Sequence, residues 1–382
     1  MLPDLRCVGI LLLTLMAWLT DLPVGAATLT PERLAEADKL IRTKLATEGA
    51  PPGLAIAILA GAHPVATMSY GTANLEQSTP VDVESIFPVA SITKVFTALA
   101  ILQLEQAGRL STEDALSRFL PNFPNAAQIT LSDLLVHTSG IAEFTDIPTF
   151  ADHQERDWKP DELIAMVAAA PPLHAPRQVC LYSDSGYILL GRIVELASGQ
   201  PFMEYVKERV AQPLAMPSVA AGTHRDLVPH RVDGYVQDGS GWINAPYVSL
   251  QAPWAAGGLT ARVDDLVRLA PALKADGPLL QPASYAKMVA PVVLAGGKAC
   301  RLDLPGANAT YGYGLEIVHF DDLPDHRAIG KSGVFPGYGG YFAAFEGSDL
   351  AVAALANADG SLPFTVEAVH DIAKLFLSGP TP

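Results

Sequence analysis

The sequence is poor in cysteine and in the residue clusters that bind metal ions. It has three cysteines in 382 residues, no C-x-x-C motif, and no H-x-x-x-H motif among its nine histidines. His224 and His230 flank Asp226, but Pro229 lies in the same segment, which is typical of a solvated loop rather than of a ligand set. We therefore predict no metal site, and the sequence indicates no cofactor.

Basic residues are also scarce. The chain has 25 Lys and Arg against 40 Asp and Glu, a formal net charge of −15. Nucleic acids and anionic membranes are bound by basic surfaces, so neither is expected as the main partner. An apolar fraction of 49% with only 17% charged residues excludes intrinsic disorder. No internal repeat or low-complexity linker divides the chain, and we predict one domain over residues 27–382.

No apolar run is long enough to span a bilayer, which takes about 20 residues. The uncharged stretch from Val8 to Leu19 has 12 residues and is followed by Val24-Gly25-Ala26, which fits the small-residue rule for signal-peptidase cleavage. A buried N-terminal helix is the alternative, but Pro23 would break it. We predict a signal peptide at 1–26, a periplasmic or secreted protein, and no stable membrane anchor after cleavage.

Removing the signal would also remove Cys7 and leave Cys180 and Cys300. An exported protein with two cysteines can join them in a disulfide. The sequence contains no geometric information on this pair, so the disulfide stays open at this point.

Hydrophobic periodicity places strands near both ends of the chain and helices in the middle. We predict an α+β fold in which an antiparallel sheet is built from both termini and flanked by helices, with a helical lobe inserted in the middle. The sheet lobe would hold residues 27–107 and 300–382, and the helical lobe residues 108–299. The predicted helices are 31–47, 95–104, 160–170, 186–198, 202–211, 263–274 and 363–377, and the predicted strands are 54–59, 65–70, 314–320, 340–346 and 350–357.

Three short motifs occur in order along the chain: Ser91-Ile-Thr-Lys94, Tyr182-Ser-Asp184 and Lys331-Ser-Gly333. The S-x-x-K pattern alone is weak, because a chain with this many serines and lysines should contain it about half a time by chance. A second copy, Ser284–Lys287, lies in a short segment between prolines and is interpreted as surface. Ser91 instead precedes the most apolar helix of the chain.

The chemistry of the first motif depends on that helix. Residues at i and i+3 share a helix face, so the Lys94 ammonium can approach the Ser91 hydroxyl. A serine is a poor nucleophile until a base takes its proton. Lysine and tyrosine are almost fully protonated at neutral pH. Burial lowers the pKa of a lysine, and nearby cations lower the pKa of a tyrosine, so each can become a base in a suitable site. We expect Ser91, Lys94, Tyr182 and Lys331 to meet in one locally cationic pocket.

These motifs resemble those of the serine hydrolases of the β-lactamase and penicillin-binding-protein fold. The resemblance is strongest to the branch that contains class C β-lactamases, D,D-peptidases and family VIII esterases, and it covers about residues 32–376. It includes further segments in the same order, namely Leu134–Gly140, Tyr182–Gly191, Gln212–Met216, Ala255–Leu259 and Val352–Asn357.

The resemblance implies a role for each motif residue. Ser91 would be the acylated nucleophile, Lys94 its proton partner, and Tyr182 the base that also protonates the leaving group. Lys331, with Ser332 and Gly333, would lie on the strand that flanks the cleft and hold a substrate carboxylate. The backbone N–H groups of Ser91 and Val334 would form the oxyanion hole, where each donor stabilises the transition state by about 3–4 kcal/mol.

Asp184 departs from the family's usual Y-x-N motif. An asparagine can donate to a substrate amide carbonyl, whereas a carboxylate only accepts. We hypothesise that Asp184 lies near Lys94 and keeps it protonated, which leaves Tyr182 as the working base. The alternative alignment treats Ser183-Asp-Ser185 as a variant S-D-N motif of the class A type. The spacing of about 90 residues from Ser91 favours the tyrosine alignment.

His137 and Ser139 lie in a His-Thr-Ser-Gly segment that suggests a serine–histidine pair. The segment follows an apolar helical run and ends in Gly140, which is typical of a helix C-cap, so we interpret it as structural.

Together these patterns predict an exported hydrolase that forms a Ser91 acyl-enzyme with an amide or ester. A small-molecule or peptide substrate, carboxylate-bearing and of the β-lactam or D-amino-acid peptide type, is favoured by Lys331. A carboxylesterase is favoured by the missing Asn donor, and a penicillin-binding sensor without turnover is the third alternative.

Overall fold

The computed structural model describes residues 29–61, 63–294 and 296–378, so the predicted signal peptide lies outside the described residues. Its centre is a nine-stranded sheet in the order β3-β2-β1-β14-β13-β12-β11-β10-β9. Strand β1 (Gly53–Ala60), from the N-terminal part, pairs antiparallel with β14 (Leu350–Ala356), from the C-terminal part. The predicted α+β fold, with one sheet built from both termini, is confirmed.

The remaining strands of this sheet also pair antiparallel with their neighbours. Hydrophobic periodicity missed β3, β9 and β10, which are short, and β12, whose apolar pattern is interrupted by glycines and Lys331. A strand that carries Lys331 was expected only from the family resemblance. The strands are β2 (Ala66–Asn74), β3 (Thr79–Pro80), β9 (Arg301–Leu304), β10 (Ala307–Tyr311), β11 (Glu316–His319), β12 (Ala328–Phe335) and β13 (Tyr338–Phe345).

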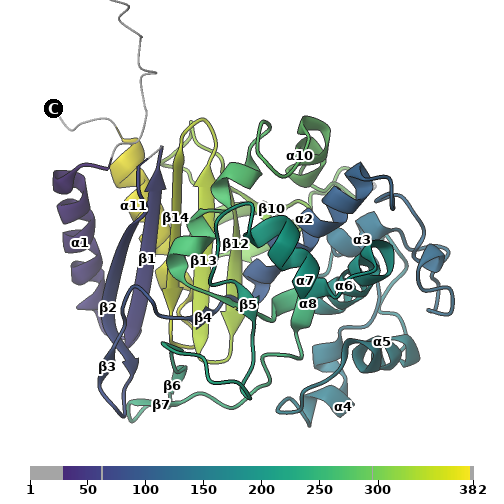
Figure 1. Cartoon of the computed structure of the whole chain (residues 1–382), viewed down its shortest axis with the longest axis horizontal. Helices are drawn as coiled ribbons and strands as arrows, with labels where there is room; N and C mark the ends of the chain where they lie inside the picture. Colours follow the sequence, from purple (N-terminus) through teal and green to yellow (C-terminus); the bar gives the residue numbers. More distant parts are fainter. Residues whose placement is uncertain (1–28, 62, 295, 379–382) are drawn as a thin grey trace, which may run out of the picture.

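Helices cover both faces of the sheet (Figure 1). Alternation along β1 sends Leu54 and Ile56 toward α1 (Pro31–Leu45) and α11 (Leu362–Leu377), and Ala55 toward the opposite core. That second core surrounds α2 (Thr93–Gln106), which is buried nearly all round. The motif that contains Ser91 and Lys94 therefore lies where α2 meets the sheet and the helical segments beyond it.

Most of the regular elements between α2 and β9 are helices, and long loops join them. The predicted helix at 202–211 is present, because α7 (Phe202–Val206) continues directly into a π-helical turn at Lys207–Ala211. The predicted helix at 263–274 is broken: α9 (Val263–Val267) is followed by a separate 3₁₀ turn that contains Pro271. The other helices are α3 (Leu131–Leu135), α4 (Pro148–Ala151), α5 (Pro160–Ala169), α6 (Asp184–Ser198), α8 (Trp254–Gly257) and α10 (Pro282–Met288).

Two small sheets lie beside the main one. The first has the order β4-β8-β5, and the second pairs β6 with β7. Their strands are β4 (Phe87–Pro88), β5 (Ala220–Ala221), β6 (Tyr235–Gln237), β7 (Trp242–Asn244) and β8 (Leu259–Ala261). Within residues 29–61, 63–294 and 296–378, no helix combines the length and the apolar character needed to cross a membrane.

Candidate active site

Ser91 lies in a 3₁₀ turn, Ala90–Ile92, that leads directly into α2. Ala90 has a φ of 47°, a left-handed conformation that is uncommon for a residue with a side chain. Such conformations persist where surrounding contacts fix the backbone, and they concentrate at functional sites. The turn keeps the predicted i, i+3 relation, and the Lys94 ammonium lies 3.0 Å from Ser91 Oγ.

The Lys94 ammonium is fully buried and has three acceptors. Its Nζ lies 3.0 Å from Ser91 Oγ, 2.5 Å from Asp184 Oδ1 and 2.8 Å from the Ala256 carbonyl oxygen. An ammonium has three N–H donors, so all of them are used. This confirms that Asp184 lies beside Lys94, and the geometry is that of a charged lysine that donates to the serine rather than one that accepts its proton.

Tyr182 reaches the same serine from the other side of the cleft. It stands in the extended segment before α6, whose N-cap Ser183 accepts the backbone N–H of Gly186 at 3.3 Å. Because this cap fixes where the helix begins, Tyr182 is held just outside it, and its hydroxyl donates to Ser91 Oγ at 2.9 Å. Ser91, Lys94 and Tyr182 therefore form one hydrogen-bonded cluster.

Burial raises the pKa of Tyr182 above its ordinary value of 10.0. The Lys331 charge and the hydrogen bond with Ser91 act in the opposite direction, whereas Asp184 and Glu316 raise the pKa further. Nearby cations were expected from the sequence to lower the pKa of Tyr182 and so make it a base. Burial and the carboxylates of Asp184 and Glu316 raise this pKa by more than the cation lowers it.

Lys331 is also paired with a carboxylate. Its Nζ lies 2.7 Å from Glu316 Oε1 on the neighbouring strand β11, and both side chains are at most 3% exposed. Glu316 also accepts the Ser332 hydroxyl at 2.6 Å and the Ser332 backbone N–H at 3.0 Å. The prediction of a locally cationic pocket is therefore wrong, because each buried ammonium has an anionic partner. Lys331 Nζ still lies 5.3 Å from the centre of the Tyr182 ring.

Gly333 and Val334 complete the edge of the cleft. A Cβ on Gly333 would lie 2.4 Å from the Val89 carbonyl oxygen and 3.3 Å from the Ser91 nitrogen, so only glycine allows this approach. The Ser332 N–H points toward β11, where it donates to Glu316. Backbone N–H groups two residues apart in a strand point to the same side, so the Val334 N–H also points toward β11. The last residue of β12 that pairs with β11 is Gly330, so Val334 lies past the end of this pairing. This orientation suits the predicted oxyanion donor.

Three residues near the motifs were given no part in the site by the sequence reasoning. Glu143 accepts the Ser185 backbone N–H at 3.2 Å, and burial together with the Asp184 charge raises the pKa of Glu143 to about 7. His137, predicted to be only structural, is 2% exposed, and its ring centroid lies 4.4 Å from that of Tyr182. Glu316 is the third residue missed, and its signal was a charged side chain within an apolar strand. Neither Glu143 nor His137 carries a comparable signal in the sequence.

Cys180 and Cys300 form a disulfide with a Cα–Cα distance of 5.7 Å, which resolves the question that the sequence left open. Cys180 is two residues before Tyr182, and Cys300 immediately precedes β9. The bridge therefore ties the loop that carries Tyr182 to the sheet.

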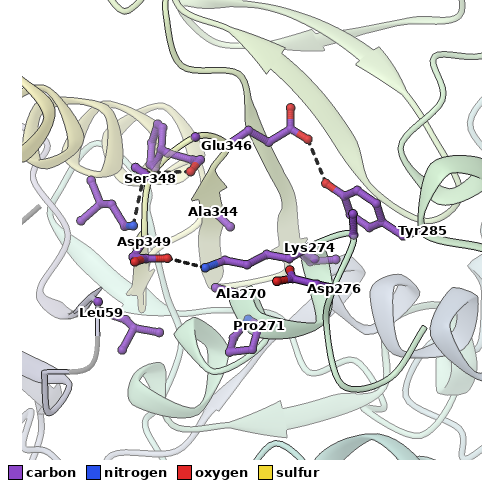
Figure 2. Close-up of a pocket in the computed structure, with 16 residues that line it drawn as sticks. Leu59, Ala270, Pro271, Lys274, Asp276, Tyr285, Ala344, Glu346, Ser348 and Asp349 are labelled. Carbon is purple, nitrogen blue, oxygen red and sulfur yellow. Dashed lines mark hydrogen bonds and ion pairs between the residues drawn. The ribbon is translucent and has the colours of Figure 1, made fainter. Parts of the chain in front are cut away.

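The second S-x-x-K copy has a different environment. Ser284 is buried on α10, against the prediction of a surface segment, and Lys287 pairs with Glu105 at 3.0 Å. A hollow of about 720 Å³ lies nearby. Figure 2 shows residues that line it, among them Lys274, Tyr285 and Asp349. None of the motif residues lines it, so size alone does not identify the site. The exposed loop predicted around His224 is confirmed.

Comparison with known proteins agrees with the geometry. The family model described as Beta-lactamase matches residues 37–375. Penicillin-binding protein 4* of Bacillus subtilis (strain 168) is 30% identical over 286 residues, which are 71% of this chain but only 60% of that protein. D-amino acid amidase from Ochrobactrum anthropi SV3 has a TM-score of 0.78 at 24% identity, covering 90% of this chain and 98% of the amidase. A penicillin binding protein from Bacillus halodurans has a TM-score of 0.73 at 26% identity, covering 89% and 98%.

Proposed function

The chain belongs to the beta-lactamase family of serine hydrolases, and we propose that it hydrolyses an amide or ester through an acyl-enzyme on Ser91. One observation carries the proposal: Ser91 Oγ lies within hydrogen-bond distance of both Lys94 Nζ, at 3.0 Å, and Tyr182 Oη, at 2.9 Å. A serine held between a fixed cation and a second proton-transfer group is the arrangement that nucleophilic catalysis requires.

The mechanism divides the work between the two groups. Lys94 stays charged, because its three donors already have acceptors, and it stabilises the developing negative charge on Ser91 Oγ. Tyr182, as phenolate, takes the Ser91 proton while Oγ attacks the carbonyl carbon. The phenol then returns that proton to the leaving amine or alcohol, and water releases the acyl group in a second step.

For the substrate class, we favour a β-lactam or a D-amino-acid peptide. The support is the 30% identity to a penicillin-binding protein. A carboxylate-bearing substrate would be held by Lys331 and Ser332 on β12, and its carboxylate would compete with Glu316 for the Lys331 ammonium.

A carboxylesterase is the second candidate, and a specific observation favours it. Lys331 is 2% exposed and already paired with Glu316, while Asp184 offers no donor for an acylamino carbonyl. Both features weaken the recognition of charged or amide-bearing substrates relative to neutral esters. A protein that binds penicillin without turnover would have the same acylation step with slow release.

We also propose that the protein is exported after cleavage behind Ala26. The apolar run at Val8–Leu19 supports export. The Cys180–Cys300 disulfide supports an oxidising compartment. Expression with the full leader, cell fractionation and N-terminal sequencing test this: a mature chain that begins at Ala27 outside the cytoplasm supports export, and an uncleaved cytoplasmic chain contradicts it.

One experiment tests the activity and separates the substrate classes. The protein is incubated with nitrocefin, a p-nitrophenyl ester and fluorescent penicillin, and intact mass reports the acylation of Ser91. Turnover of nitrocefin indicates a β-lactamase, stable penicillin labelling a peptidase or sensor, and turnover of the ester alone an esterase. The matched control is Ser284→Ala, at the second S-x-x-K copy. Full activity of Ser91→Ala on every substrate would contradict the mechanism.

A further inference from the structure

His137 contacts the catalytic tyrosine segment at three points. Its carbonyl oxygen accepts the Leu181 backbone N–H at 3.0 Å, and its Nδ1 accepts the Ser183 backbone N–H at 3.1 Å. Its ring lies against the Tyr182 ring, with centroids 4.4 Å apart. One residue therefore holds the backbone on both sides of Tyr182 and supports the phenol ring between them.

The backbone of His137 is itself unusual. Its φ is 60°, a left-handed conformation in a residue that is only 2% exposed. For a residue other than glycine this conformation costs about 1–2 kcal/mol. A capping role alone would be better served by glycine or asparagine, which adopt it more readily. The retained histidine indicates that the imidazole contributes something that those residues would lack.

The imidazole must be neutral to make these contacts. A backbone N–H can only donate, so Nδ1 must be the unprotonated nitrogen and Nε2 must carry the hydrogen. Burial lowers the pKa of His137 well below its ordinary value of 6.5, and the charges of Lys94 and Lys331 act in the same direction. The acceptor therefore stays available to Ser183 across the neutral and alkaline range.

We propose that His137 is a positioning residue that sets the distance of the Tyr182 hydroxyl from Ser91 Oγ. The proposal rests on the proposed function, since it gives Tyr182 the role of base for Ser91. The Ser183 contact directs the segment into α6, the Leu181 contact fixes its other end, and the ring limits how far the phenol can swing. Loss of the Nδ1 acceptor should move Tyr182 away from the serine and leave the substrate contacts on β12 in place.

Three variants test this role. His137→Phe keeps an aromatic ring but removes the acceptor, and we expect a loss in kcat of about 10- to 100-fold because small displacements of a catalytic group are costly. For a substrate whose acylation limits turnover, KM reports substrate binding, and we expect it to change by less than about twofold because the buried His137 side chain does not line the surface that a substrate reaches. His137→Asn places an amide oxygen close to the Nδ1 position and tolerates the left-handed backbone, so it should recover most of kcat. His230→Phe is the matched control, because His230 has a φ of 58° and its ring nitrogen pairs with Asp82 instead of with the tyrosine segment.

The measurements are kcat and KM with the p-nitrophenyl ester and nitrocefin, and the rate of Ser91 labelling by fluorescent penicillin, each per folded molecule. A wild-type protein that never acylates overturns the proposed function itself. A wild-type protein that acylates, together with a folded His137→Phe of unchanged kcat, overturns only the positioning role. If His137→Phe does not fold, the test rests on His137→Asn. A folded His137→Asn that loses more than about tenfold in kcat contradicts the acceptor role.

Discussion

The cleft contains two lysine–carboxylate pairs that differ in what they contact. Lys94 donates to Ser91 Oγ and to Asp184, and the Asp184 side chain is 28% exposed. Lys331 and Glu316 are sealed at 2% and 3% exposure, and their remaining hydrogen bonds go to Ser332 of the same strand pair. The two pairs therefore differ in what they do: the first sets the charge beside Ser91, and the second neutralises a buried ammonium between β11 and β12, two inner strands of the sheet.

This comparison predicts that the first pair controls the reaction. Lys94→Ala should lower kcat/KM by about 10³-fold, because it removes both the donor to Ser91 and the partner of Asp184. The matched control is Lys287→Ala, the lysine of the second S-x-x-K copy, which should leave kcat/KM unchanged. Steady-state kinetics with the p-nitrophenyl ester measure both variants. A loss of less than about tenfold in Lys94→Ala would show that the pair is not needed for the reaction.

The second pair should instead control stability. Glu316→Ala leaves the Lys331 ammonium buried without a partner and should lower the free energy of unfolding by about 3–5 kcal/mol. Asp184→Ala should cost less, because the Asp184 side chain is 28% exposed and Lys94 keeps two other acceptors, Ser91 Oγ and the Ala256 carbonyl oxygen. Urea denaturation compares the two variants, and the double variant Lys331→Met/Glu316→Leu should recover most of the loss. Equal losses in the two single variants would remove the distinction between the pairs.

The disulfide joins the loop of the first pair to the sheet that carries the second. Because Cys180 and Cys300 are 120 residues apart, replacing both by alanine should lower the free energy of unfolding by about 2–4 kcal/mol. Each single replacement should lose as much as the double one, since each breaks the same bond. Thermal unfolding of the three variants and of the reduced wild type checks this, and additive single losses would argue against the bridge.

The smallest effect is expected at the carboxylate beside Lys94. Asp184 raises the pKa of Tyr182, so Asp184→Asn should lower that pKa and move the acid limb of the rate profile to lower pH. At neutral pH the rate of proton transfer, expressed as a fraction of its maximum at alkaline pH, should be up to about tenfold higher in Asp184→Asn than in the wild type. The pH dependence of kcat/KM for both proteins measures this shift. An unchanged acid limb and rate would contradict the hypothesis for Asp184.

Much of this cleft follows from local patterns in the sequence. Ser91 and Lys94 are three residues apart at the start of an apolar helix, and this spacing alone brings their side chains together. The antiparallel sheet was predicted from strands at both ends of the chain, and the register of β1 with β14 confirms it. Asp184 was placed beside Lys94 through the family alignment of the tyrosine motif.

The remainder depends on contacts that no local pattern specifies. Glu316 meets Lys331 only through the register of β11 with β12, where Glu316 lies opposite Gly330. His137 meets Tyr182 because the irregular segment before α6 returns to the end of α3. The apolar run at 263–274 predicted one helix because periodicity did not account for the break at Pro271.

The most direct test is the pH dependence of Ser91 acylation in the wild-type protein, measured as a pre-steady-state rate with fluorescent penicillin or the p-nitrophenyl ester. If Tyr182 is the base, its phenolate fraction limits the rate, and burial keeps the pKa of Tyr182 above its ordinary value of 10.0. The logarithm of the rate should then rise with a slope of about one between about pH 7 and 9. Tyr182→Phe should abolish the rise. A rate that is already constant at pH 7, or a rise that survives in Tyr182→Phe, would contradict the assignment of Tyr182 as the base.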